Sequence, residues 1–103
     1  MTENYTINST ELADILRNRP HSITLLDVRE TEEFEEDRLE GCVLIPLGDL
    51  MSRARSELDP TADLVIYCAH GVRSMHALMG LRSLGFERLR SLEGGLCAYR
   101  EET

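Results

Sequence analysis

The feature that most constrains the fold is a regular alternation of short apolar segments with segments of helical periodicity. Residues 23–28 and 64–67 are almost entirely apolar, and strands of this kind are typical of a parallel sheet whose two faces are both covered. The stretches between the apolar segments repeat their apolar positions with the spacing of amphipathic helices. We therefore expect a three-layer α/β domain, with a five-stranded, mostly parallel sheet flanked by helices on both faces.

Local signals set the limits of these elements. Asn8, followed three residues later by Glu11, has the pattern of a capping box and predicts that a helix begins there. Pro20, Pro46 and Pro60 are expected to stop the elements that precede them. The predicted strands cover residues 5–7, 23–28, 41–45, 64–67 and 88–92, and the predicted helices begin after Asn8 and cover residues 47–58, 74–84 and 96–100.

Residues 30–40 are strongly acidic, with seven Asp or Glu side chains in eleven positions. Only Phe34 and Leu39 offer apolar anchors there, so we expect a short helix and turn whose charges face solvent. The alternative interpretation of this segment is a docking site for a basic partner.

Length and charge narrow the function classes. A chain of 103 residues with 42% hydrophobic content is long enough for one compact domain, which we place at residues 1–103. A formal net charge of −8 disfavours binding to nucleic acid or to anionic membrane surfaces, because both need a basic face. The chain has no apolar run of membrane-spanning length, and Met1 to Asn4 lack the pattern of a signal peptide, so we expect a cytoplasmic protein.

The basic and sulfur-containing residues limit the available chemistry. All eleven basic residues are Arg, which excludes lysine Schiff-base and lysine general-base mechanisms. Cys42, Cys68 and Cys97 make an odd count without metal-type spacing, so the sequence suggests neither a disulfide framework nor a zinc site. We expect no metal and no cofactor.

The candidate nucleophile is Cys68, which follows the predicted strand 64–67 and precedes a helix. A thiol at a helix N-terminus meets unpaired backbone N–H groups and the positive end of the helix dipole, and both favour the thiolate. Lowering the pKa by roughly two units needs only about 2.7 kcal/mol, which N–H donors and Arg73 can supply. Asp27 ends another buried strand, so it should lie at the same edge of the sheet.

Over nearly its whole length the chain resembles the single-domain rhodaneses, a family of sulfurtransferases. Four segments in this order carry the resemblance: Leu26-Asp27-Val28-Arg29 with Glu33-Phe34, Gly41 with Ile45-Pro46-Leu47, Cys68-Ala69-His70-Gly71-Val72-Arg73-Ser74, and Leu92-Glu93-Gly94-Gly95 with Ala98-Tyr99.

The resemblance implies that Cys68 accepts a sulfane sulfur from thiosulfate or a persulfide donor. It would hold the sulfur as a persulfide and pass it to a thiophilic acceptor such as cyanide or a thiol, in ping-pong covalent catalysis. The loop would surround the terminal sulfur with N–H groups as an anion-binding nest. The expected active-site loop consists of Ala69, His70, Gly71, Val72, Arg73 and Ser74.

Several roles stay open at this point. Arg73 can neutralise an anionic donor or fold back onto a carboxylate to brace the loop. His70 can help hold a donor or simply face solvent. Asp27 and Arg29 are expected to support the loop through a charge-assisted contact, with ordinary surface pairing as the alternative.

Spacing also separates this chain from related cell-cycle phosphatases, which place five residues between the catalytic Cys and Arg. Here only four residues separate Cys68 from Arg73, and the smaller loop suits a sulfur atom better than a phosphoryl group. Cys42 and Cys97 are interpreted as small core residues, with a resolving thiol as the alternative for each.

Two other functions compete with a small-molecule sulfurtransferase. One is a non-catalytic rhodanese-like module that binds a partner or senses redox state, which the intact Cys68 and its loop disfavour. The other is a sulfur relay that uses the same chemistry with a protein persulfide as donor or acceptor, because the loop resembles that of rhodanese modules fused to carrier-activating enzymes.

Overall fold

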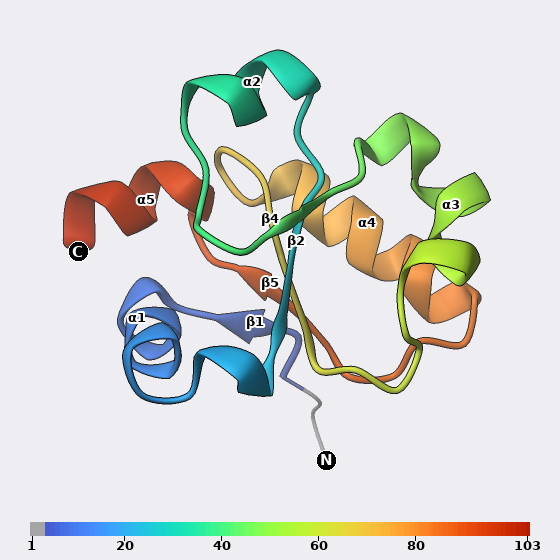
Figure 1. Ribbon diagram of the computed structural model, residues 1–103, viewed down its shortest axis with the longest axis horizontal. Coiled ribbons are helices and arrows are strands. Elements are labelled where there is room, and N and C mark those ends of the chain that lie inside the picture. Colours follow the sequence, from blue (N-terminus) through green and yellow to red (C-terminus); the bar gives the residue numbers. More distant parts are fainter. Residues whose placement is uncertain (1–3) are drawn as a thin grey trace.

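The computed structural model describes residues 4–103, which form one twisted parallel sheet between two layers of helices (Figure 1). The strand order is β1-β5-β4-β2-β3, and every strand pair in the described part of the chain is parallel. The α/β prediction is confirmed. Residues 1–3 lie outside the described range. They belong to the predicted domain 1–103 and to the N-terminal stretch Met1 to Asn4.

The strands are short and the helices are mostly of two or three turns. The strands are β1 (Thr6–Ile7), β2 (Thr24–Asp27), β3 (Val43–Leu44), β4 (Leu64–Tyr67) and β5 (Leu89–Leu92). The α-helices are α1 (Ser9–Asn18), α2 (Thr31–Glu36), α3 (Leu50–Glu57), α4 (Val72–Ser83) and α5 (Gly95–Glu102), and 3₁₀ turns cover Pro20–Ser22 and Leu47–Asp49. Within the described residues, no helix combines the length and the apolar character that crossing a bilayer requires.

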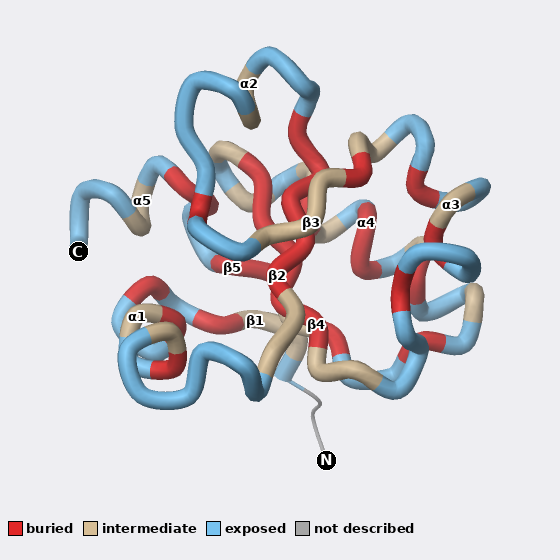
Figure 2. The backbone as a smooth tube through the Cα atoms, viewed as in Figure 1, coloured by how far each residue is buried: buried red, intermediate tan, exposed pale blue. Residues whose placement is uncertain are grey.

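Two apolar clusters, one on each face of the sheet, hold the layers together. Ile66 of β4 belongs to the cluster that includes Leu78 of α4, whereas the adjacent Val65 belongs to the cluster that includes Leu12 of α1. Successive side chains of a strand point to opposite faces, so a strand that is covered on both sides must be apolar throughout. Figure 2 shows the central strands as buried, which explains why residues 64–67 lack a polar position.

The ends of several elements follow local chemistry. The predicted capping box is present, because Asn8 Oδ1 accepts from Glu11 N at 2.8 Å while Asn8 N donates to Glu11 Oε1 at 3.0 Å. The helix predicted for residues 47–58 instead begins as a 3₁₀ turn, in which Asp49 N donates to Pro46 O at 2.8 Å. The helix predicted from residue 74 already begins at Val72, because Gly71 takes a left-handed conformation with φ +98° and turns the chain there.

Candidate active site

Cys68 lies at the carboxyl edge of the sheet, directly after β4. Asp27 of β2 is the register partner of Tyr67, the residue before it, so the two predicted site segments meet at one edge as expected for parallel strands. Cys68 is almost fully buried, with 1% of its surface exposed.

The sulfur of Cys68 sits inside the turn that leads into α4. Gly71 N donates to Cys68 Sγ at 3.1 Å and Ser74 N donates to it at 3.3 Å, while Ser74 Oγ lies 3.5 Å from the same sulfur. Burial alone would raise the pKa of the Cys68 thiol, but hydrogen bonds from the side chain of Ser74 and from the N–H groups of Ser74, Gly71 and His70 outweigh it. The pKa is therefore lowered, and the site favours a thiolate.

The N-terminus of α5 supports the backbone on the other side of Cys68. Leu96 N donates to Cys68 O at 2.8 Å and Cys97 N donates to Ala69 O at 3.0 Å. Gly95, with φ +65°, makes this approach possible, because a Cβ there would overlap the carbonyl groups of Ala69 and Cys68. Sequence reasoning did not assign Gly95 to the site, although the Gly94-Gly95 pair was the signal that could have indicated it.

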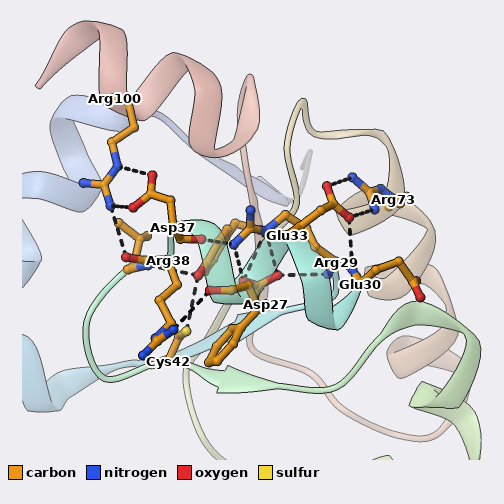
Figure 3. Close-up of polar contacts among 12 residues, drawn as sticks. Asp27, Arg29, Glu30, Glu33, Asp37, Arg38, Cys42, Arg73 and Arg100 are labelled. Atoms are coloured by element: carbon orange, nitrogen blue, oxygen red, sulfur yellow. Dashed lines mark hydrogen bonds and ion pairs between the residues drawn. The ribbon is translucent and has the colours of Figure 1, made fainter.

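Arg73 folds back onto a carboxylate of the opposite helix. Its Nη1 and Nη2 atoms lie 2.7 Å and 3.0 Å from Glu33 Oε1 and Oε2 in a bidentate ion pair (Figure 3). Glu33 is itself held in place, because its Oε1 also accepts from Glu30 N at 3.0 Å in the capping box of α2. Hydrogen bonds from Arg73 are the main reason why the pKa of Glu33 falls to about 2. The end of the loop formed by residues 69–74 is thus attached to α2.

Asp27 and Arg29 form a buried ion pair rather than an ordinary surface pair. Arg29 Nη2 lies 2.7 Å from Asp27 Oδ2, and the two side chains are 6% and 0% exposed. The same Nη2 atom donates to Asp37 O at 2.6 Å, and the guanidinium group lies 5.6 Å from the ring centroid of Tyr67. Among residues 4–103, the hydrogen bonds of this ion pair fasten the segment after α2 to β2 and do not reach residues 69–74. Support of the loop by the pair stays a prediction.

The other loop residues differ in their exposure. His70 and Val72 are exposed, and Ala69 is half-buried. His70 Nε2 lies 4.0 Å from Cys97 Sγ. Cys97 is exposed, so its interpretation as a core residue is wrong: it lies on the outer side of α5, and Leu96 is the residue that packs inward.

Cys42 differs from Cys68 in its surroundings. It precedes β3 instead of lying within a strand, and it is half-buried against the cluster on the α1 side of the sheet. Burial raises the pKa of its thiol, and Tyr67 Oη donates to its Sγ at 3.3 Å. Within the described residues, His, Cys, Asp and Glu side chains do not gather in groups of three or more that could hold a metal ion. Cys68 is thus the cysteine whose surroundings favour a nucleophile.

Comparison with known protein families gives one match, the rhodanese-like domain, over residues 8–102. A protein of Bacillus subtilis (strain 168) that is named as a sulfur carrier protein, YrkF, is 37% identical over 82 residues. That alignment covers 80% of this chain and 44% of YrkF. The chain therefore spans less than half of the length of this relative.

Solved structures agree over almost the whole chain. The rhodanese-like domain of Alr3790 from Anabaena sp. has a TM-score of 0.89 and 30% identity, over 97% of this chain and 76% of that one. The human single-domain sulfurtransferase TSTD1 has a TM-score of 0.84 and 25% identity, over 98% of this chain and 99% of that one.

Proposed function

The chain belongs to the family of rhodanese-like domains, and from this premise we propose that it is a sulfurtransferase that carries a sulfane sulfur on Cys68. The observation that carries the proposal is the position of Cys68 Sγ, which accepts hydrogen bonds from two backbone N–H groups at the start of a helix. Such donors stabilise a negatively charged sulfur far more than a neutral one.

In the first half-reaction, the Cys68 thiolate attacks the outer sulfur of thiosulfate. A bond forms between that sulfur and Cys68 Sγ, while the sulfur–sulfur bond of the donor breaks and sulfite leaves with the electron pair. In the second half-reaction, cyanide or a thiolate attacks the terminal sulfur of the persulfide, and the electron pair returns to Cys68 Sγ. With cyanide the product is thiocyanate, and the thiolate is regenerated without an external oxidant or reductant.

The residues around the sulfur have separate tasks in this scheme. Gly71 and Ser74 stabilise the anionic sulfur, and Gly71 provides the left-handed turn that directs the loop N–H groups inward. Arg73 adds a positive charge near Cys68 while its ion pair with Glu33 fixes the far end of the loop. Arg73 therefore acts mainly by holding the loop in position, and contact with an anionic donor would require it to leave Glu33.

Steady-state kinetics with thiosulfate and cyanide test this proposal. We expect parallel lines in double-reciprocal plots, as a ping-pong reaction requires, and loss of thiocyanate formation in Cys68→Ser. Cys42→Ala is the matched control, because Cys42 is half-buried with a raised pKa, and this variant should turn over like the wild type. Turnover that survives in Cys68→Ser would contradict the proposal. Binding of partners with no turnover would favour the non-catalytic binding or redox-sensing module.

A protein persulfide is the second candidate for the donor or the acceptor. The naming of YrkF as a sulfur carrier protein and the 44% share of YrkF that the chain covers favour an exchange of sulfur between proteins. In addition, Val72 lies next to Gly71, which binds the sulfur, and is 65% exposed, so it can contact a partner surface. Single-turnover loading of Cys68 by a cysteine desulfurase persulfide should then be at least about tenfold faster than loading by an equal concentration of thiosulfate, a difference of roughly 1.4 kcal/mol in barrier. Equal rates would favour the small-molecule donor.

A further inference from the structure

A chain of two buried hydroxyl groups ends at the Cys68 sulfur. Ser91 Oγ lies 2.7 Å from Ser74 Oγ, which in turn lies 3.5 Å from Cys68 Sγ. Ser91 lies in β5, Ser74 in the first turn of α4 and Cys68 directly after β4, and each is at most 2% exposed. Ser91 is fixed by the sheet, since it is the register partner of Ile66 on β4 and its N–H donates to Tyr5 O at 2.7 Å.

The number of available protons decides which group donates in each of these two hydrogen bonds. A serine hydroxyl donates one hydrogen bond, and a thiolate donates none. When Cys68 is ionised, a hydrogen bond between Ser74 and the sulfur needs the proton of Ser74, and the short bond to Ser91 then has Ser91 as the donor. When the sulfur is protonated, both bonds can reverse, with the thiol donating to Ser74 and Ser74 donating to Ser91.

We propose that Ser91 is a positioning residue of the sulfur site, which holds the Ser74 hydroxyl with its proton directed at Cys68 Sγ whenever this sulfur is negatively charged. The proposal rests on the sulfurtransfer proposed above, because the sulfur of Cys68 alternates there between a thiolate and a neutral inner persulfide sulfur. Because the inner sulfur of a persulfide carries no proton, only the hydrogen bond between Ser74 and Ser91 would reverse in this alternation. The reversal needs no movement of the backbone.

Ser91 would act on Cys68 through Ser74, and the other polar and charged side chains near Cys68 have different partners. Arg73 is bound to Glu33 of α2, His70 is exposed in the loop, and Cys97 of α5 contacts His70 rather than the two serines. Hydrogen bonds in a chain strengthen one another by roughly 10–30%. Loss of Ser91 should therefore cost the thiolate only part of its bond to Ser74, whereas loss of Ser74 removes this charge-assisted bond entirely.

The test is the pKa of Cys68, measured from the pH dependence of iodoacetamide alkylation of the Cys68 peptide by mass spectrometry. We expect Ser91→Ala to raise this pKa by about half a unit, which is roughly a threefold loss of thiolate at a pH below the pKa. Ser74→Ala should raise it by about one unit or more. In the double variant, the Ser91 change should add nothing to the Ser74 change, because Ser91 acts only through Ser74.

Ser9→Ala is the matched control for burial of a serine. Ser9 is 1% exposed and its Oγ has no hydrogen-bond partner within residues 4–103, so its removal should leave the pKa of Cys68 unchanged. Ser91→Cys retains a hydrogen-bond donor, the weaker S–H group, in a slightly larger side chain, and it should give a smaller shift than Ser91→Ala. If Ser91→Ala does not fold, Ser91→Cys decides the question.

An unchanged pKa of Cys68 in the folded Ser91 variants, or a Ser91 shift that persists in the Ser74→Ala background, would overturn the proposal. Alkylation needs no sulfur donor, so this outcome is independent of sulfur transfer. A chain that shows the shift but accepts no sulfur would instead refute the proposed function.

Discussion

Substitution of Gly95 by alanine should separate α5 from the backbone of Cys68 and Ala69. The added methyl group would overlap the carbonyl groups of Cys68 and Ala69, which are backbone atoms and cannot rotate away. The two hydrogen bonds donated by Leu96 N and Cys97 N to these same carbonyls, at 2.8 Å and 3.0 Å, would be lost as the helix moves.

The expected magnitude has two parts. An alanine at φ +65° is strained by about 1–2 kcal/mol relative to glycine, and each lost hydrogen bond costs about 0.5–1.5 kcal/mol. Together these give a loss of about 2–5 kcal/mol in the free energy of unfolding, a large share of the total for a domain of this size.

Gly85→Ala isolates the strain from the overlap. Gly85 also has a positive φ, +96°, but a Cβ built there meets nothing within 4 Å, so this variant should lose only the strain of about 1–2 kcal/mol. Urea unfolding of the two variants and the wild type measures both effects. A Gly95→Ala protein that is as stable as Gly85→Ala would refute the close contact between α5 and the loop.

Three further changes test other contacts of the site. Glu33→Gln should lower the free energy of unfolding near neutral pH. Its difference from the wild type in urea unfolding should close as the pH falls from 4.5 to about 2, because a carboxylate with a depressed pKa stabilises the fold only while it is ionised in the folded state. A constant difference over this range would contradict the ion pair with Arg73. Asp27→Asn leaves the buried Arg29 without its counter-charge and should lower the free energy of unfolding by about 3–5 kcal/mol. Glu57→Gln breaks an exposed pair and should leave the urea midpoint nearly unchanged. Equal effects of the two substitutions would contradict the burial of the Asp27 pair. Tyr67→Phe removes the acceptor that lies 3.1 Å from Leu39 N and should cost about 1–3 kcal/mol in thermal or urea unfolding, and an unchanged stability would show that this N–H group finds another partner.

Much of the fold follows from the local pattern of the chain. Residues 64–67 form a strand with the predicted limits, and the capping box of Asn8 and Glu11 forms as the sequence indicates. The strand and the capping box each depend on residues that are near one another in sequence. The uninterrupted apolar run of residues 64–67 indicates that this strand is covered on both faces. The placement of Cys68 at the carboxyl edge follows from the same pattern, because parallel strands end at a common edge.

The contacts that shape the site come from residues far apart in the chain. The partner of Arg73 is Glu33, 40 positions earlier, and many carboxylates of the acidic segment were equally available to it. Ser91 is linked to Cys68 through the hydroxyl group of Ser74, a contact that a linear pattern does not reveal. Cys97 was expected in the core because α5 packs inward, but its exposure depends on the rotation of the helix about its axis, which the contact of Gly95 with the loop backbone fixes.

The most direct test of the central claim is the intact mass of the wild type and of Cys68→Ser after incubation with thiosulfate, measured again after cyanide is added. We predict that the wild type gains the mass of one sulfur atom and loses it to cyanide, while Cys68→Ser gains nothing. No gain in the wild type with thiosulfate or with a persulfide donor, or an equal gain in both proteins, would contradict transfer of sulfur through Cys68.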